Sequence, residues 1–261
     1  MIGLLPLALA GAALAAPVAT VSSSSSSALR AVDELDEKDV ARLDEFDDAY
    51  NEWRAELSRI RNMKPKEGEA RPAFPDPPYA AFWPDFDGFA TAGSSRAQVW
   101  CLQHFMAGDD PAENRADYLR RVQTIFDDPK ADLTAMPRVL YRASRSPLDK
   151  DAGRELLASL VKIAKKPEVV AEAAYMRVEV LREREASDEL LARMMDEYRA
   201  VAKAHPKTRY GKRAGGKVFK HDHLQIGMVA PDIVGKDVDG NPMKLSDFRG
   251  KVTVIDFWGF W

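Results

Sequence analysis

The sequence has a single cysteine, Cys101, among its 261 residues. One thiol excludes an internal disulfide, a Cys-x-x-Cys redox pair and a zinc site built from cysteines. An excess of charge of one sign is also lacking, because 38 Lys and Arg residues nearly balance 41 Asp and Glu residues and leave a net charge of −3. We therefore expect no nucleic-acid partner, since such proteins carry a basic field. The 46% hydrophobic and 30% charged residues are typical of a water-soluble globular protein.

Charged side chains are missing altogether from residues 1–21. An apolar run extends from Leu4 to Leu14, and small residues then offer a cleavage site of the Ala-x-Ala kind at Ala13–Ala15. This order is typical of a secretory signal peptide. We predict a signal peptide over residues 1–19, cleaved near Ala15–Ala19, and hence export to the bacterial periplasm or cell envelope.

An uncleaved anchor is the alternative for the same end of the chain. The stretch Ile2–Val21 has about 20 residues, which is long enough to cross a bilayer. Its many alanines and glycines are only weakly lipophilic, so cleavage is favoured, and no stable membrane span is expected afterwards. Residues 20–28, which include the serine run Ser22–Ser27, are predicted to form a flexible spacer.

Residues 29–220 are predicted to form a helical region, so the fold class is mostly α. Between Leu29 and Met63, apolar side chains recur three and four positions apart, as on one face of a helix. They are Leu43, Phe46, Tyr50, Trp53, Leu57 and Ile60. Residues 64–95 are rich in proline and aromatic residues, so we expect an irregular stretch that packs its aromatic side chains onto the helical layer.

Further helices are predicted to follow from Ala97 to Lys220. Asp110–Glu113 reads as a helix N-cap followed by proline at the first helical position, and Ser146-Pro147 is predicted to open another helix. The apolar positions lie on one side of each predicted helix. Each helix must therefore bury that side against neighbours, as stacked helical hairpins do.

One stretch of this region resembles a tetratricopeptide-like repeat. The pattern is Tyr198-x6-His205-Pro206-x3-Tyr210-Gly211-x2-Ala214, in which small residues allow two helices to approach and proline ends the first helix. The resemblance covers one repeat well and the others poorly. It implies a helical region that binds a protein partner or holds domains apart.

Three features of the helical region could carry chemistry. Cys101 lies among apolar neighbours, which favours a buried, inert thiol over a reactive one. His221 and His223 could present two imidazoles to a metal from an extended segment, but a third ligand at a recognisable spacing is lacking, and we expect no metal site. A basic cluster is predicted to be a solvated face rather than a site for phosphate or an acidic partner. It consists of Lys203, Lys207, Arg209, Lys212, Arg213, Lys217 and Lys220.

The pattern changes to strand signals after Leu224. An Ala-Pro pair at 230–231 leads into an apolar stretch at Ile233–Asp237. Asp239-Gly240-Asn241 predicts a hairpin turn, and Met243–Leu245 predicts the returning strand.

The rest of this segment predicts two further elements. Ser246–Arg249 is expected to form one helical turn with a serine cap. Val252–Trp258 is a continuous apolar run, which is typical of a strand buried on both faces.

This order of motifs resembles the opening of a thioredoxin-like domain of the redoxin branch, which includes the TlpA/ResA-type and AhpC/TSA-type proteins. The pattern of that family runs from an Ala-Pro entry through an Asp-Gly hairpin and a Leu-Ser-Asp-Phe-x-Gly-Lys stretch to a hydrophobic strand and Phe-Trp-x-x-Trp-Cys-x-x-Cys. The chain follows it as far as Phe257–Trp261. We therefore expect residues 224–261 to be an incomplete α/β domain, consisting of the hairpin and the first central strand.

The resemblance implies thiol-disulfide exchange, in which a thiolate at a helix N-terminus attacks a disulfide and a second thiol resolves the product. It implies that Asp256 stands where thioredoxin has a buried carboxylate, and that Trp258 and Trp261 flank the redox loop. The partners that it implies are disulfide-bearing protein substrates and a thiol reductant, with no cofactor.

The sequence given stops at Trp261, one residue before the first cysteine of the family pattern, and Cys101 is a single thiol in another segment. By family we therefore expect an exported thiol-disulfide oxidoreductase, present here as an inactive fragment with no intact catalytic residue. A hairpin and one strand cannot bury a core of their own, so we expect the tail to lack cover. The alternative is a non-enzymatic helical-repeat module that binds a protein partner.

Overall fold

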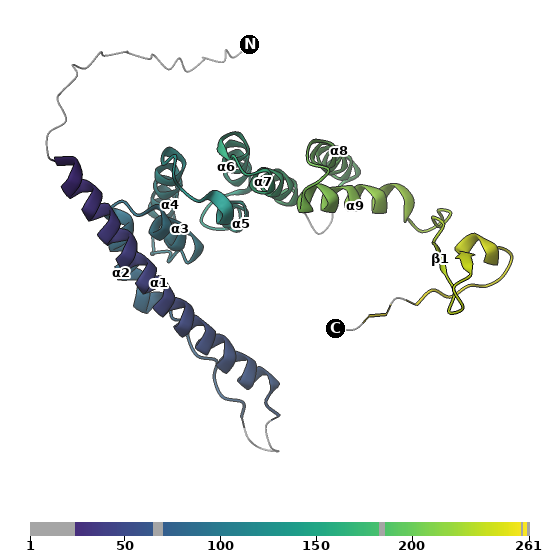
Figure 1. The fold of residues 1–261 in the computed structure, drawn as a ribbon, viewed down its shortest axis with the longest axis horizontal. Helices are drawn as coiled ribbons and strands as arrows, with labels where there is room; N and C mark the ends of the chain where they lie inside the picture. Colours follow the sequence, from purple (N-terminus) through teal and green to yellow (C-terminus); the bar gives the residue numbers. More distant parts are fainter. Residues whose placement is uncertain (1–23, 65–69, 183–185, 257, 260–261) are drawn as a thin grey trace, which may run out of the picture. The chain divides into compact units, whose positions relative to one another are not determined.

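The computed structural model describes residues 24–64, 70–182, 186–256 and 258–259, with side chains from residue 37 onward (Figure 1). The predicted signal peptide at 1–19 and its cleavage site lie outside these residues. The chain divides into two compact units, residues 1–94 and 95–261. In the described part, most residues are helical and the only strands form one small antiparallel sheet. The expected succession of a helical region and a short β segment is therefore present.

The described residues of the first unit, 24–64 and 70–94, contain two helices joined by aromatic packing. Helix α1 spans Ser24–Asn62 and α2 spans Tyr79–Thr91. Phe46 of α1 is buried, and its ring centre lies 5.4 Å from that of Phe82 and 6.4 Å from that of Phe86. The apolar side of α1 that the spacing predicts therefore packs against α2.

Two sequence predictions about this unit are wrong in part. Residues 24–28 of the predicted spacer belong to α1, because serine costs a growing helix only about 0.5 kcal/mol relative to alanine. Residues 79–91 of the predicted irregular stretch form α2, although Pro84 lies inside it. Burial of Phe82, Phe86 and Ala90 on one side compensates for the backbone hydrogen bond that Pro84 cannot donate. Residues 70–77 are irregular, as expected.

The second unit is a succession of packed helices. Its helical elements are α3 (Ser95–Gln103), α4 (Pro111–Asp127), the 3-10 turn η1 (Leu133–Ala135), α5 (Met136–Ala143), α6 (Lys150–Ile163), α7 (Pro167–Glu179), α8 (Asp188–Ala204) and α9 (Arg209–His223). Each of the α helices contacts at least one other, as in α3 with α4, α6 with α7 and α8 with α9. Two hydrophobic clusters lie among these helices, one around Leu140, Leu157 and Leu160 and the other around Tyr175 and Tyr198.

The helix starts follow local capping chemistry. The Asp110 carboxylate accepts hydrogen bonds from the backbone N–H groups of Ala112 and Glu113, so the predicted cap of α4 is confirmed. The predicted opening of a helix at Ser146-Pro147 is wrong. Helix α6 begins after Asp149, whose carboxylate accepts a 2.8 Å hydrogen bond from the backbone N–H of Ala152, because Asp149 supplies the cap that α6 uses.

Helices α8 and α9 form the hairpin that the Tyr198–Ala214 pattern predicts. Helix α8 ends at Ala204, two residues before Pro206, and the hydroxyl of Thr208 caps α9 by accepting from the N–H of Gly211. A methyl group on Gly211 would lie 1.8 Å from the carbonyl oxygen of His205, so glycine is required for this approach. The relationship to tetratricopeptide repeats stays a prediction, since a helical hairpin alone does not distinguish that family.

The last described segment contains the hairpin. Strand β1 (Val234–Lys236) pairs antiparallel with β2 (Pro242–Lys244), and Val234 lies opposite Lys244. Gly240 has a φ of 86°, which the predicted Asp-Gly turn requires. The 3-10 turn η2 (Leu245–Phe248) follows.

The predicted buried strand at Val252–Trp258 is not formed where it is described. Residues 252–256 have no ladder partner among the described residues, and Val252 and Val254 are 100% and 89% exposed. A strand satisfies its backbone only through a neighbouring strand, so an apolar run without one stays irregular. The expectation that this tail lacks cover agrees with the exposed side chains.

Candidate functional site

The three residues that the redoxin resemblance singles out are not brought together in a described pocket. Asp256 is exposed, and Trp258 keeps 75% of its surface exposed. Trp261 lies outside the described residues. In this structure, therefore, Asp256 does not have the buried carboxylate environment that the resemblance implies.

Aspartate side chains stabilise the turns of residues 232–246 by accepting hydrogen bonds. The Asp237 carboxylate accepts hydrogen bonds from the backbone N–H groups of Asn241 and Asp239, at 2.8 and 2.9 Å, and also from the Asn241 side-chain amide. The backbone hydrogen bond from Asn241 is the largest cause of the lowered pKa of Asp237. The carboxylate thus closes the hairpin turn from inside, an arrangement typical of Asx turns.

A second carboxylate ties the entry of the segment to its end. Asp232 accepts from the backbone N–H of Ser246 at 2.9 Å and from the Ser246 hydroxyl at 2.8 Å, and these bonds lower its pKa. Ser246 was expected to cap the helical turn, but Asp247 does so by accepting from the backbone N–H of Lys244. The acidic residues in the pattern Asp-x-Asp-Gly-Asn were the signal for the Asp237 turn. The role of Asp232 depends on a partner 14 positions away.

Cys101 lies in α3 and is fully buried between Trp100 and Leu102, which are also buried. The predicted buried position is confirmed. A thiol with no exposed surface cannot meet a protein disulfide, so Cys101 does not provide the chemistry of the redoxin family.

The two histidines expected on an extended segment lie instead at the end of α9. Residues two positions apart on a helix point to nearly opposite sides, so His221 and His223 do not converge. His221 Nδ1 lies 2.9 Å from an Asp222 oxygen, and the His223 ring packs against Phe219. Within residues 24–64, 70–182, 186–256 and 258–259, no group of three or more His, Cys, Asp or Glu side chains is placed to hold a metal ion.

The basic cluster lies on α9, at the end of α8 and in the turn between these two helices. Most of its members are exposed, as predicted for a solvated face, but the side chains of two members contact α7. Lys217 lies 3.6 Å from Glu179 of α7, and the Arg213 guanidinium lies 5.4 Å from the ring centre of Tyr175. Part of the cluster therefore packs α9 onto α7.

Glu179 is the centre of a polar network that sequence patterns do not reveal. Burial raises the pKa of Glu179, but the neighbouring Tyr175 and Tyr198 hydroxyls and the charge of Lys217 outweigh it, so the pKa is lowered. The Tyr198 hydroxyl donates to Glu179 at 2.7 Å. This network joins α7, α8 and α9 and pairs the Glu179 carboxylate with Tyr198 and Lys217, which is a structural role.

Comparison with known proteins gives short matches to several proteins of one class, the thiol-disulfide oxidoreductases. The chain is similar to the thiol-disulfide oxidoreductase ResA of Bacillus thuringiensis subsp. konkukian, with 39% identity over 46 residues, which is 18% of this chain and 27% of that protein. It is 44% identical over 38 residues to ResA of Geobacillus thermodenitrificans, covering 15% of this chain and 22% of that protein.

ResA of Bacillus anthracis shows 40% identity over 40 residues, covering 15% of this chain and 23% of that protein. The chain therefore spans about a quarter of the length of these curated relatives. No family model and no solved structure matches the chain. These matches support a relationship between a short part of this chain and thioredoxin-like oxidoreductases.

Proposed function

We propose that residues 224–261 are the opening part of a redoxin-type thioredoxin-like domain, joined to the helical region, in a protein whose family activity is thiol-disulfide exchange. The observation that carries the proposal is the order of motifs in this segment, from the Ala-Pro entry to Trp261, together with the ResA matches of similar length. The hairpin β1–β2, with its Asp-Gly turn, fits the same pattern.

The chemistry requires two thiols that this chain does not have. Disulfide exchange begins with attack by a thiolate and ends when a second thiol displaces the first. The chain's one cysteine is buried Cys101, so the 261 residues given do not carry out either step. In a completed domain Asp256 would lie beside the resolving thiol, and Trp258 and Trp261 would flank the redox loop.

The test is an insulin disulfide-reduction assay on two proteins. One is the 261-residue chain, and the other is a chimera in which Trp261 is followed by the portion of Geobacillus thermodenitrificans ResA that comes after its matched segment. We expect no reduction by the chain alone and reduction by the chimera. A chimera in which serine replaces the grafted cysteines is the matched control and is expected to be inactive.

Activity of the 261-residue chain would contradict the assignment of the chemistry to absent thiols. A chimera that stays unfolded beyond residue 224 would contradict the assignment of this segment to the redoxin fold. Hydrogen exchange of the backbone amides beyond residue 224, which reports whether this segment is folded in the chimera, separates these outcomes.

We also propose that the protein is exported to the periplasm or cell envelope, on the support of the apolar run Leu4–Leu14 and the small residues after it. Among the residues that the structure describes, no helix is both long and apolar enough to cross a membrane. N-terminal sequencing of the protein from cell fractions tests this. A start near Ala15–Ala19 in the periplasmic fraction is expected, whereas an intact N-terminus in the membrane fraction would indicate an anchor.

The second candidate function is a protein-interaction module. The observation that favours it is the exposed basic surface of α9, with Lys212 and Lys220 facing solvent on a well-packed helical support. A pull-down with the full chain and with a chain lacking residues 224–261 tests it. A partner retained by both favours the module, and loss of every partner with the tail contradicts it.

A further inference from the structure

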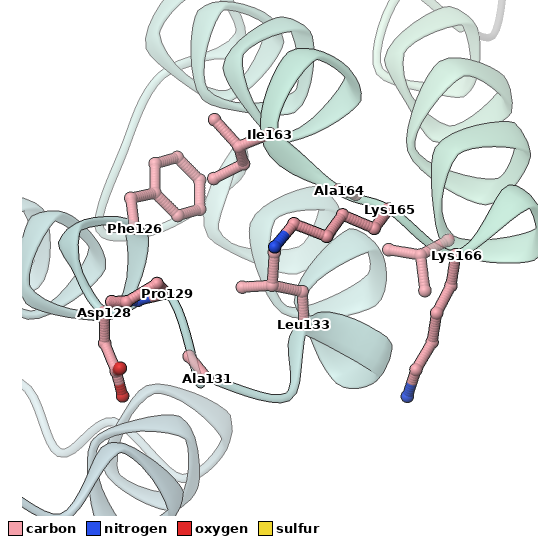
Figure 2. A pocket seen from close by; sticks show the side chains of 10 residues that line it. Phe126, Asp128, Pro129, Ala131, Leu133, Ile163, Ala164, Lys165 and Lys166 are labelled. Carbon is pink, nitrogen blue, oxygen red and sulfur yellow. The ribbon is translucent and has the colours of Figure 1, made fainter.

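The second unit contains an apolar pocket with a volume of about 280 Å³. It lies where the end of α4, the loop before η1, the end of α6 and the start of α7 meet (Figure 2). The side chains in its wall are mostly aliphatic or aromatic. They include Phe126, Pro129, Ala131, Leu133, Ile163 and Val169.

Three charged residues lie at the edge of the pocket, and they differ in their partners. The Lys166 ammonium donates to Asp132 at 3.0 Å and to the Thr134 hydroxyl at 3.2 Å. Asp128 accepts from the backbone N–H of Lys130 at 2.9 Å. Among the described residues, Lys165 forms no hydrogen bond or ion pair, although it also lines the pocket.

Figure 2 shows how these side chains are directed. The Lys165 side chain extends toward the region of Phe126 and Leu133, whereas the Lys166 and Asp128 side chains point away from it. The pocket therefore combines an apolar wall with one available positive charge, and the nearby carboxylate is turned outward.

We propose that this pocket binds a small aliphatic monocarboxylic acid, with its chain against the apolar wall and its carboxylate at the Lys165 ammonium. A cavity of about 150 Å³ holds benzene, so the present volume accommodates on the order of ten non-hydrogen atoms. An eight-carbon acid such as octanoate has this size. Its one anionic group matches the one available cation.

The wall chemistry distinguishes this ligand from a peptide. A bound peptide brings several amide groups, each of which must find a hydrogen-bond partner when it is buried. The side chains around Phe126, Leu133 and Val169 offer such groups no partner. A simple fatty acid brings no polar group other than its carboxylate.

Titration of the full chain with octanoate, followed by two-dimensional NMR, tests the proposal. We expect a dissociation constant of about 1 mM, in keeping with ten non-hydrogen atoms and one exposed ion pair. The shifted amides should belong to residues 126–133 and 163–169. Acetate lacks the chain and octanol lacks the charge, so each should bind more weakly than octanoate, by at least about a hundredfold for acetate and about threefold for octanol.

Two variants with the same change of charge sharpen the test. Lys165→Gln should weaken octanoate binding by about three- to fivefold and leave octanol binding unchanged. Lys162→Gln is the matched control, since Lys162 is exposed in α6 and does not line the pocket. A third variant, Ala131→Leu, fills the pocket and should reduce binding of both ligands, with its thermal unfolding checked beside it.

Four results would overturn the proposal. The first is that octanoate causes no NMR shift up to about 10 mM, which is tenfold above the expected dissociation constant. The second is that Lys165→Gln and Lys162→Gln have equal effects on octanoate binding. The third is that the shifted amides lie outside the pocket. Octanoate binding that does not change in a folded Ala131→Leu variant would also place the ligand elsewhere.

Discussion

The helices α3–α9 bury their apolar side chains, whereas the segment that follows Leu224 leaves its apolar side chains exposed. A helix satisfies its backbone within itself, so each helix needs only a neighbour to cover its apolar side. Leu157 and Leu160 of α6 have no exposed surface. A strand needs partners for its backbone and cover for its side chains, and Val252 is 100% exposed. An apolar stretch therefore becomes part of a core only where neighbouring elements cover its side chains and pair its backbone.

The largest expected effect comes from truncating one apolar side chain in each region. Leu160→Ala should lower the free energy of unfolding by about 3 kcal/mol, because it leaves a cavity in the first core cluster. Val254→Ala should change it by less than about 0.5 kcal/mol, because Val254 is 89% exposed. Urea denaturation followed by circular dichroism measures both. Similar losses for the two variants would remove the difference between the regions.

A smaller effect is expected from two glycines of α9. Gly211→Ala should cost about 2 kcal/mol, because its methyl group would meet the His205 carbonyl oxygen. Gly216→Ala is the matched control, since nothing lies within 4 Å of the added carbon, and it should stabilise α9 by about 0.5–1 kcal/mol. Thermal unfolding compares the two, and destabilisation by Gly216→Ala would show that space is not the deciding factor.

The free energy of unfolding of the helical region should depend on pH through His104, which directly follows α3. Burial, together with the charge of Arg142, lowers the pKa of His104 from 6.5 to about 4. Between these values the unfolded chain binds a proton that the folded chain does not, so stability falls as the pH drops from about 6.5 to 4. We expect a loss of about 1 kcal/mol, reduced by the partial exposure of the ring.

Replacing the ring sharpens that measurement. Denaturation at pH 7, 5.5 and 4.5 should show a smaller loss for His104→Gln than for the unchanged chain. His205→Gln is the control and should retain the loss. A pH dependence that is unaffected by His104→Gln would assign the proton uptake to another group.

The smallest effect is expected in the tail. Asp237→Ala removes the acceptor of three hydrogen bonds in the hairpin turn. It should shift the NMR signals of residues 233–245, leave the urea midpoint of the helices in place, and change their free energy of unfolding by less than about 0.5 kcal/mol. The control is Asp239→Ala, because only the backbone N–H of Asp239, and not its carboxylate, is hydrogen-bonded to Asp237. A shifted midpoint would mean that the hairpin and helices unfold together.

The features that could be predicted from the sequence are those that depend on interactions between residues close together in the chain. The Asp110 cap, the buried position of Cys101 and the Asp-Gly turn depend on residues a few positions apart, and all three are confirmed. The helix α2 was missed because the packing of Phe82 and Phe86 outweighs the effect of Pro84, and proline is the stronger local signal.

The parts that the sequence does not reveal depend on distant partners. Tyr198 meets Glu179 from 19 positions away, and the pocket beside Lys165 is assembled from separate segments between Phe126 and Val169. The strand predicted at Val252–Trp258 has the right composition, but composition does not tell whether a partner strand is present. Local pattern therefore predicted elements better than it predicted sites.

Hydrogen exchange at residues 252–256 tests the central claim most directly, in the 261-residue chain and in the ResA chimera. We predict near-unprotected exchange of these amides in the chain alone, slow exchange in α6 of both proteins, and protection of 252–256 in the chimera. Strong protection of 252–256 in the chain alone, or none in a chimera whose grafted part is folded, would contradict the assignment of this segment to an incomplete redoxin-type domain.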